Sequence, residues 1–135
     1  MIETRVAFEL VSPERLLLSE SVDMVVVPGA EGDFGVLVRH APLVSGVRPG
    51  VISVYNGGQV TERIFVAGGF AEVTPSRCTV LAEQAMPVAE IDRMAAEQQL
   101  KDAREDLADA KDDDERDAAA RQIAVAEAMI QASAS

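Results

Sequence analysis

Few residues among the 135 of this protein could carry out chemistry. His40 is the single histidine and Cys78 the single cysteine, and no nearby serine, cysteine or aspartate arrangement turns either into part of a nucleophilic site. One histidine and one cysteine also cannot complete the usual nitrogen and sulfur shell of a zinc site. The residue types therefore predict a non-catalytic protein that has no metal site and no cofactor.

Three consecutive aspartates, Asp112, Asp113 and Asp114, are the other group that could attract a cation. They lack the alternating spacing and the glycine of a calcium-binding loop. They stand between two alanine-rich stretches, where an aspartate can cap a helix and its charge favours the helix N-terminus. We interpret them as the solvated cap of a second helix.

A glycine-rich segment precedes His40 and is the most unusual part of the sequence. Glycines occupy positions 29, 32 and 35, and prolines follow at 42 and 49. The spacing matches neither a Walker phosphate loop, which ends in Gly-Lys-Ser/Thr, nor the Gly-x-Gly-x-x-Gly pattern of dinucleotide-binding folds. Because glycine permits tight turns and close backbone approach, we interpret the segment as turns and contact surface.

The charge balance limits the possible partners. A formal net charge of −11 argues against nucleic acid and against direct docking on anionic lipid headgroups, and it suits a partner with exposed Lys or Arg. No run approaches the ~20 apolar residues of a membrane span, and the first residues do not resemble a signal peptide. One cysteine allows no internal disulfide. These features predict a cytosolic location without membrane insertion.

The composition changes near residue 86, which predicts two domains, 1–86 and 87–135. The first is rich in Val, Gly and Pro. Alternation of Val6, Phe8 and Leu10 predicts a strand with one buried face, and residues 24–27, apolar on both faces, predict a central strand. Asn56-Gly57-Gly58 predicts a hairpin turn. Short strands at roughly ten-residue spacing predict a β-sandwich or a barrel.

The second domain has no glycine or aromatic residue after Pro87, and two narrow apolar stripes predict an antiparallel hairpin of two helices. The fold class is therefore α+β. Alanine methyls bury little area, so the hairpin should be the least stable part of the molecule. The stripes are Ala96, Leu100, Ala103, Leu107 and Ala110 in the first helix, and Ala119, Ile123, Ala126 and Ile130 in the second.

Several motifs in order resemble the epsilon subunits of bacterial F-type ATP synthases over the whole sequence. That family has three spaced glycines followed by His-Ala-Pro-Leu and Pro-Gly, then a Gly-Gly-Phe-x-Glu-Val run and a Thr-Val-Leu-Ala run. The matching residues are Gly29, Gly32, Gly35, His40-Ala41-Pro42-Leu43, Pro49-Gly50, Gly68-Gly69-Phe70-Ala71-Glu72-Val73 and Thr79-Val80-Leu81-Ala82. The opening Phe8-Glu9-Leu10-Val11-Ser12-Pro13-Glu14 matches the usual first strand and turn.

The resemblance implies a flattened N-terminal β-sandwich followed by a C-terminal two-helix hairpin. It implies a non-catalytic central-stalk subunit that joins the gamma subunit to the c ring and couples proton transport to ATP synthesis. The hairpin would regulate ATP hydrolysis, and its contact with the alpha and beta subunits is left open. The location implied is peripheral, on the cytoplasmic face of the bacterial inner membrane.

The same resemblance implies two contact sites. In the family, the loop equivalent to Glu31, Gly32 and Asp33 faces the polar loops of the c subunits, and an acidic loop suits basic partners there. The region near gamma corresponds to Arg39, His40, Ala41 and Pro42.

Two departures from the family pattern matter. Val38-Arg39 replaces the usual Pro-Gly before the histidine. Family members that bind ATP carry Ile/Leu-Asp-x-x-Arg-Ala, whereas here Ile91-Asp92 is followed by alanine at the arginine position. Without that guanidinium we expect no tight ATP binding.

Two other classes of function remain as alternatives. One is a free-standing nucleotide-sensing regulatory module, which the missing motif arginine disfavours. The other is a β-sandwich adhesion domain with a helical tail, which the single cysteine disfavours.

Overall fold

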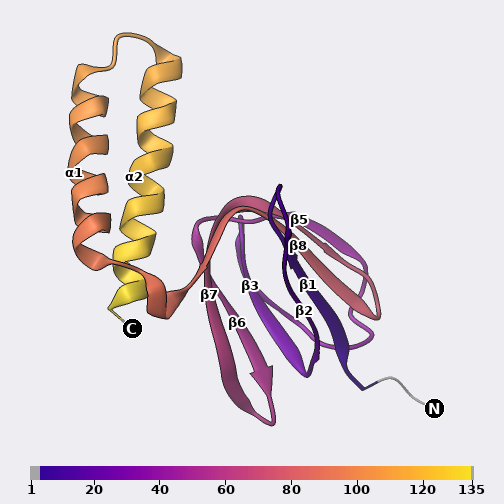
Figure 1. Cartoon of the computed structure of the whole chain (residues 1–135). Coiled ribbons are helices and arrows are strands. Elements are labelled where there is room, and N and C mark those ends of the chain that lie inside the picture. Colours follow the sequence, from indigo (N-terminus) through magenta and orange to yellow (C-terminus); the bar gives the residue numbers. More distant parts are fainter. Residues whose placement is uncertain (1–3, 135) are drawn as a thin grey trace. The chain divides into compact units, whose positions relative to one another are not determined.

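The computed structural model describes residues 4–134, and the protein divides into two compact units, one ending at Pro87 and the other beginning at Val88 (Figure 1). The first unit is built of strands and the second of helices, which confirms the predicted α+β class. The strands are β1 (Val6–Val11), β2 (Leu16–Val22), β3 (Met24–Gly29), β4 (Gly32–Val36), β5 (Leu43–Gly46), β6 (Gly50–Asn56), β7 (Gln59–Val73) and β8 (Arg77–Pro87). The helices are the short 3-10 helix η1 (Val88–Glu90), α1 (Arg93–Asp109) and α2 (Asp113–Ser133).

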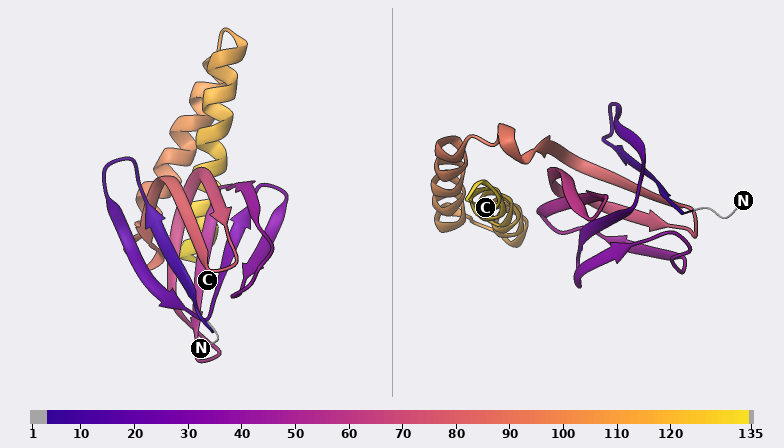
Figure 2. Two further views of the ribbon diagram at one scale, coloured as in Figure 1. Left: turned by 90° about the vertical axis from the view of Figure 1, so that its right-hand side faces the viewer. Right: turned by 90° about the horizontal axis from the view of Figure 1, so that it is seen from below.

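The strands form one hydrogen-bonded sheet in the order β2-β1-β8-β7-β6-β3-β4, with β5 also paired to β7. The long strands β7 and β8 pair twice, through 69–73 with 78–82 and through 64–67 with 84–87. Gly68 lies between the two stretches of β7 and Gly69 opens the second, both at positive φ. The sheet bends there and folds over on itself, so the sandwich, not the barrel, is the architecture adopted (Figure 2).

The core lies between the two layers of this sandwich. Val6, Phe8 and Leu10 of β1 are at most 1% exposed while their neighbours in the strand are half-buried, which confirms the predicted alternation. β3 pairs with β4 on one side and β6 on the other, as predicted for a central strand. The β6–β7 connection is the predicted glycine turn, with φ of 62° at Gly57 and 77° at Gly58.

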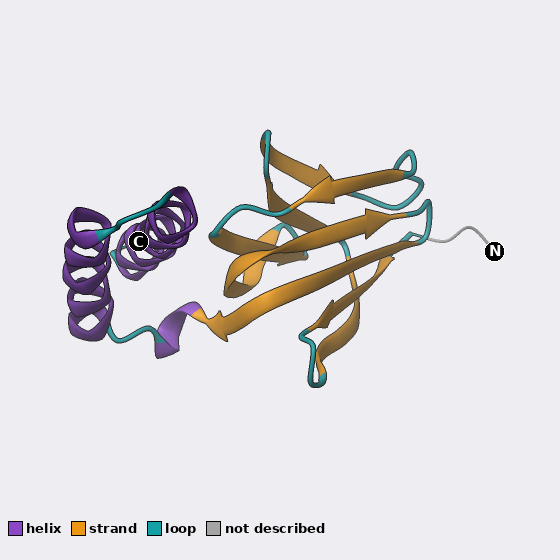
Figure 3. Ribbon diagram, turned by 90° about the horizontal axis from the view of Figure 1, so that it is seen from above, coloured by secondary structure: helices purple, strands orange, loops and turns teal. Residues whose placement is uncertain are grey.

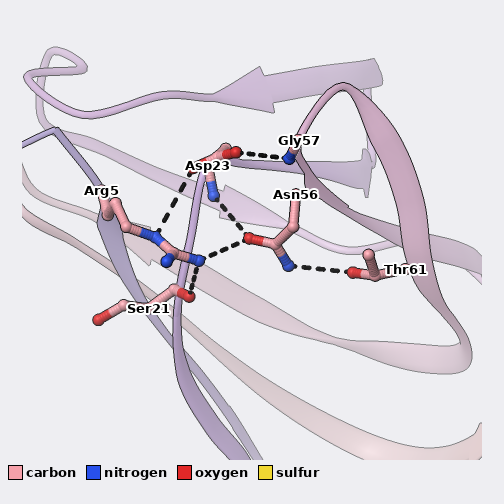
Figure 4. A network of polar contacts seen from close by, with 6 residues as sticks. All are labelled: Arg5, Ser21, Asp23, Asn56, Gly57 and Thr61. Atoms are coloured by element: carbon pink, nitrogen blue, oxygen red, sulfur yellow. Dashed lines mark hydrogen bonds and ion pairs between the residues drawn. The ribbon is translucent and has the colours of Figure 1, made fainter.

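A polar network fastens this β6–β7 turn to the start of the sandwich (Figure 4). The Arg5 guanidinium donates to the Ser21 carbonyl at 2.6 Å and to Asn56 Oδ1 at 2.7 Å. Asp23 accepts from the Gly57 amide at 2.7 Å and pairs with Arg5 at 3.6 Å. Segments far apart in the sequence are thus tied at one end of the sheet.

In the second unit, α1 and α2 lie side by side (Figure 3). Asp112 accepts from the Glu115 amide at 2.8 Å, which confirms it as the cap of the second helix. Buried alanines 96, 103, 119 and 126 form the predicted seam. Leu107, also predicted for the seam, is instead 38% exposed. Leu107 stands in the last turn of α1, where the helix pair ends and less of the partner helix covers a side chain.

Within residues 4–134, neither helix is long and apolar enough to cross a membrane.

Candidate functional site

The turn between β3 and β4 presents the residues predicted to face the c ring. Gly29 pairs with Gly32, so Ala30 and Glu31 form a two-residue turn between them. Glu31, Gly32 and Asp33 are all exposed. The structure thus brings the three predicted residues together at one tip of the sandwich.

Arg48, which no sequence motif singles out, holds both sides of this turn. Its guanidinium donates to the Gly29 carbonyl and to Asp33 Oδ1, each at 2.5 Å. Its backbone amide donates to the Pro28 carbonyl at 2.9 Å. Asp33 is therefore ion-paired, whereas the Glu31 side chain has no hydrogen bond or ion pair among residues 4–134.

The residues predicted to lie near gamma come together in the loop from β4 to β5. The His40 amide donates to the Leu37 carbonyl at 3.2 Å, which closes a turn with Val38 and Arg39 at its centre. Arg39 has φ of 66°, the positive value that a type II turn requires at its third position. The turn therefore forms although neither proline nor glycine is present. His40 is half-buried, and its Nδ1 donates to the Ala41 carbonyl at 2.6 Å.

The Arg39 turn gives a stability prediction. We expect Arg39→Gly to be more stable than Arg39→Ala by about 1 kcal/mol, because alanine keeps the cost of the left-handed conformation and glycine removes it. Both variants lose the same side-chain contacts, so their difference isolates the backbone. Chemical denaturation of the two variants measures it. Equal stabilities would mean that the turn carries no backbone strain.

A strip of exposed apolar side chains lies on the outer face of β5, β7 and β8. Val44, Phe70 and Leu81, here called the apolar strip, are 70%, 63% and 53% exposed. Phe70 stands opposite Leu81 on one side and Gly46 on the other, and Val44 lies two residues from Gly46 on the same face. The strip begins next to the His40 loop, because β5 follows that loop directly.

Ile91 and Asp92, the two residues that match the family's ATP-binding motif, lie immediately before α1. Asp92 caps the helix by accepting from the Ala95 amide at 3.1 Å. The Arg93 guanidinium pairs with Glu97 one turn further on, at 3.2 Å. The Asp92 carboxylate thus serves as a helix cap, and the guanidinium of the neighbouring Arg93 is already in an ion pair.

Two titratable groups of the first unit have shifted pKa values, the half-buried Glu62 and the buried Cys78. Glu20 on β2 stands beside Phe8 and Glu62 on β7 beside Val54, both on core-facing positions. A hydrogen bond to Glu20, followed by burial and by repulsion from Glu20, raises the pKa of Glu62 from 4.5 to about 7. Glu20 Oε1 is buried without a hydrogen-bond partner in the described part of the protein.

The other shifted group is the thiol of Cys78. Cys78 is buried, and this burial raises the pKa of its thiol to about 12.

The Glu20–Glu62 pair makes stability depend on pH. Because the folded-state pKa of Glu62 is raised, the folded protein binds more protons than the unfolded one between pH 4.5 and about 7, so stability falls as pH rises through that range. We expect Glu62→Gln to match the parent protein at pH 4.5 and to exceed it by roughly 1 kcal/mol at pH 8, a value reduced by water screening of this half-buried group. Denaturation at both pH values measures this. Glu31→Gln, at an exposed turn, is the matched control and should leave the pH profile of the parent unchanged.

Comparison with known proteins assigns both units to one family. Residues 5–88 match the family model of the beta-sandwich domain of the ATP synthase delta/epsilon chain. Residues 92–135 match the model of the C-terminal domain of the ATP synthase epsilon chain.

Curated relatives and solved structures agree with this match. The ATP synthase epsilon chain of Rhodospirillum rubrum is 59% identical over 125 residues, covering 93% of each protein. That of Paramagnetospirillum magneticum is 57% identical over 128 residues, covering 95% of this protein and 96% of the relative. A chain in the Euglena gracilis mitochondrial ATP synthase, solved as OSCP/F1/c-ring, superposes with a TM-score of 0.84 at 25% identity, covering 98% of this protein and 83% of its own length.

Proposed function

The chain belongs to the family of ATP synthase epsilon chains, and we propose that it is a non-catalytic central-stalk subunit linking the gamma subunit to the c ring. It turns with both partners and so couples proton transport to ATP synthesis. It works at the cytoplasmic face of a bacterial inner membrane as a peripheral part of the complex. Its hairpin regulates ATP hydrolysis.

The apolar strip is the observation that carries this proposal. Single exposed apolar residues are ordinary, but aligned ones on a sheet face mark an interaction surface. The apolar strip continues from the exposed Ala41 and Pro42. Together these residues form the surface that binds gamma.

The β3–β4 turn, at the start of β4, contacts the c ring, whereas the His40 loop follows the end of the same strand. This strand runs from Gly32 to Val36, so the β3–β4 turn and the His40 loop are separated by about 16 Å along it. The His40 loop and the acidic turn thus lie at the two ends of β4, and the apolar strip runs from Val44 beside the loop to Phe70 opposite Gly46, so different parts of the surface can touch two partners at once. The acidic turn faces the basic loops of the ring, and the loop with the apolar strip faces gamma.

The nucleotide-sensing alternative finds less support. Asp92 is used as a helix cap, alanine occupies the motif's arginine position, and Arg93 is paired to Glu97. No phosphate clamp follows from this arrangement.

Deleting the second unit tests whether the first unit binds the partners and the helices regulate ATP hydrolysis. A truncated protein that ends at Pro87 keeps every strand, so we expect it to co-purify with gamma and c subunits as the full-length protein does. The rate of ATP hydrolysis by the complex should change, because the regulatory helices are missing. Affinity purification and a hydrolysis assay measure the two properties. Loss of co-purification would make the hairpin an anchor rather than a regulator.

A further inference from the structure

A single residue, Arg48, makes three hydrogen bonds to β3, β4 and the turn between them. Arg48 reaches the carbonyl at the end of β3 and the carboxylate at the start of β4, while its own amide bonds to Pro28. The Ala30 amide adds a bond to the Gly46 carbonyl at 2.8 Å. A guanidinium presents its donors in a planar fork, so it can serve a carbonyl and a carboxylate together in a fixed geometry.

The same contact divides the two carboxylates of the turn into different roles. Asp33 is tied to Arg48, whereas Glu31 lies at the exposed position between Gly29 and Gly32, where its carboxylate pairs with none of the described residues. The local charge is −2 from Glu31 and Asp33 plus +1 from Arg48, which leaves −1. That remaining charge belongs to Glu31.

We propose that Arg48 is the positioning residue of the ring-facing turn: it holds the turn through Gly29 and Asp33 so that Glu31 alone is presented to a basic loop of the c ring. This inference rests on the proposed function. In this arrangement Asp33 supports the turn and does not itself contact the c ring. It also identifies Arg48 as a determinant of ring binding although it need not touch the ring.

Binding to complexes stripped of their own epsilon subunit separates positioning from simple attraction. Arg48→Gln changes the local charge from −1 to −2, so attraction to basic loops alone would tighten binding. Positioning requires the opposite, because the turn is no longer held. We expect the dissociation constant of full-length Arg48→Gln for stripped complexes in membranes to rise about tenfold.

Other variants show where the effect arises. Arg48→Lys keeps the charge but loses the fork, and should weaken binding about threefold. Glu31→Gln should weaken it about tenfold and flatten its dependence on salt, whereas Asp33→Asn, which keeps an acceptor for Arg48, should change it less than about threefold. Arg116→Gln removes the same charge from the hairpin, where Arg116 pairs with Asp113, and should leave binding unchanged.

Hydrogen exchange of the isolated proteins checks that the variants fold and that the turn loosens. In Arg48→Gln the Ala30 amide should exchange faster while the amides of β7 keep their protection. Binding of Arg48→Gln as tight as that of the parent, or tighter, would overturn the positioning role. Equal binding of the parent protein to stripped complexes and to catalytic heads lacking a c ring would instead overturn the ring contact, and with it the proposed function.

Discussion

Gly69→Ala is expected to unfold the sandwich or to lower its stability by at least about 4 kcal/mol. A Cβ at position 69 would lie 1.9 Å from the carbonyl oxygen of Leu81 and 2.9 Å from its carbonyl carbon. Both are backbone atoms of the neighbouring strand, so they cannot move aside without breaking the β7–β8 pairing that joins the two layers. The φ of 121° at Gly69 is a further cost for any residue with a side chain.

Gly57→Ala is the matched control for this prediction. Gly57 also has a positive φ, 62°, but a Cβ there would meet no atom within 4 Å. It should cost only about 1 kcal/mol, the strain of a left-handed alanine. Thermal unfolding followed by circular dichroism should therefore show a drop of roughly 20 °C for Gly69→Ala and of a few degrees for Gly57→Ala. Similar melting temperatures for the two variants would show that the sheet tolerates a side chain at its bend.

Phe70→Glu is expected to weaken binding of the gamma subunit at least about 100-fold while leaving the fold intact. Phe70 is 63% exposed in the isolated protein, so its replacement removes little from the core. In the proposed interface the aromatic ring is the largest member of the apolar strip, and a carboxylate there would be buried without a partner. Titration of purified gamma with the variant, by calorimetry, measures the loss.

Val60→Glu supplies the control for an apolar-to-acidic change on the same strand. Val60 is 44% exposed but lies ten residues from Phe70, about 33 Å along β7. Its replacement should leave the affinity for gamma within a factor of about two. A loss at Val60 equal to that at Phe70 would mean that the added charge, and not the apolar strip, decides binding.

Local features of this fold could be predicted because they depend on neighbours in the sequence. The alternation in β1, the glycine turn between β6 and β7 and the Asp112 cap each follow from a few adjacent residues. The roles of residues 31–33 and 39–42 follow from a family resemblance, and the structure shows that each group is contiguous and largely exposed. Their partners in the complex remain proposals.

Contacts between distant segments could not be predicted from the same patterns. Arg48 lies 15 residues from Asp33 and 19 from Gly29, and nothing in the local sequence relates them. The apolar strip arises only because the register places Phe70 beside Leu81. The Glu20–Glu62 pair likewise depends on two strands that are not neighbours in the sequence.

The Arg39 turn shows the limit of residue preferences. Val38-Arg39 lacks the proline and glycine that favour such a turn, yet the hydrogen bonds of the Arg39 amide to Pro75 and of the His40 amide to Leu37 fix the backbone. Tertiary contacts therefore override the local preference at this position.

Cross-linking in an assembled ATP synthase distinguishes the two ends of the sandwich. A cysteine is placed at Glu31 in one variant and at Pro42 in another, with Cys78 replaced by alanine in both, and each is joined to its neighbour by a short bifunctional reagent. The proposed arrangement predicts a product with the c subunit from position 31 and a product with gamma from position 42. A product with gamma from position 31, or no product with the c subunit from that position in fully assembled complexes, would contradict it.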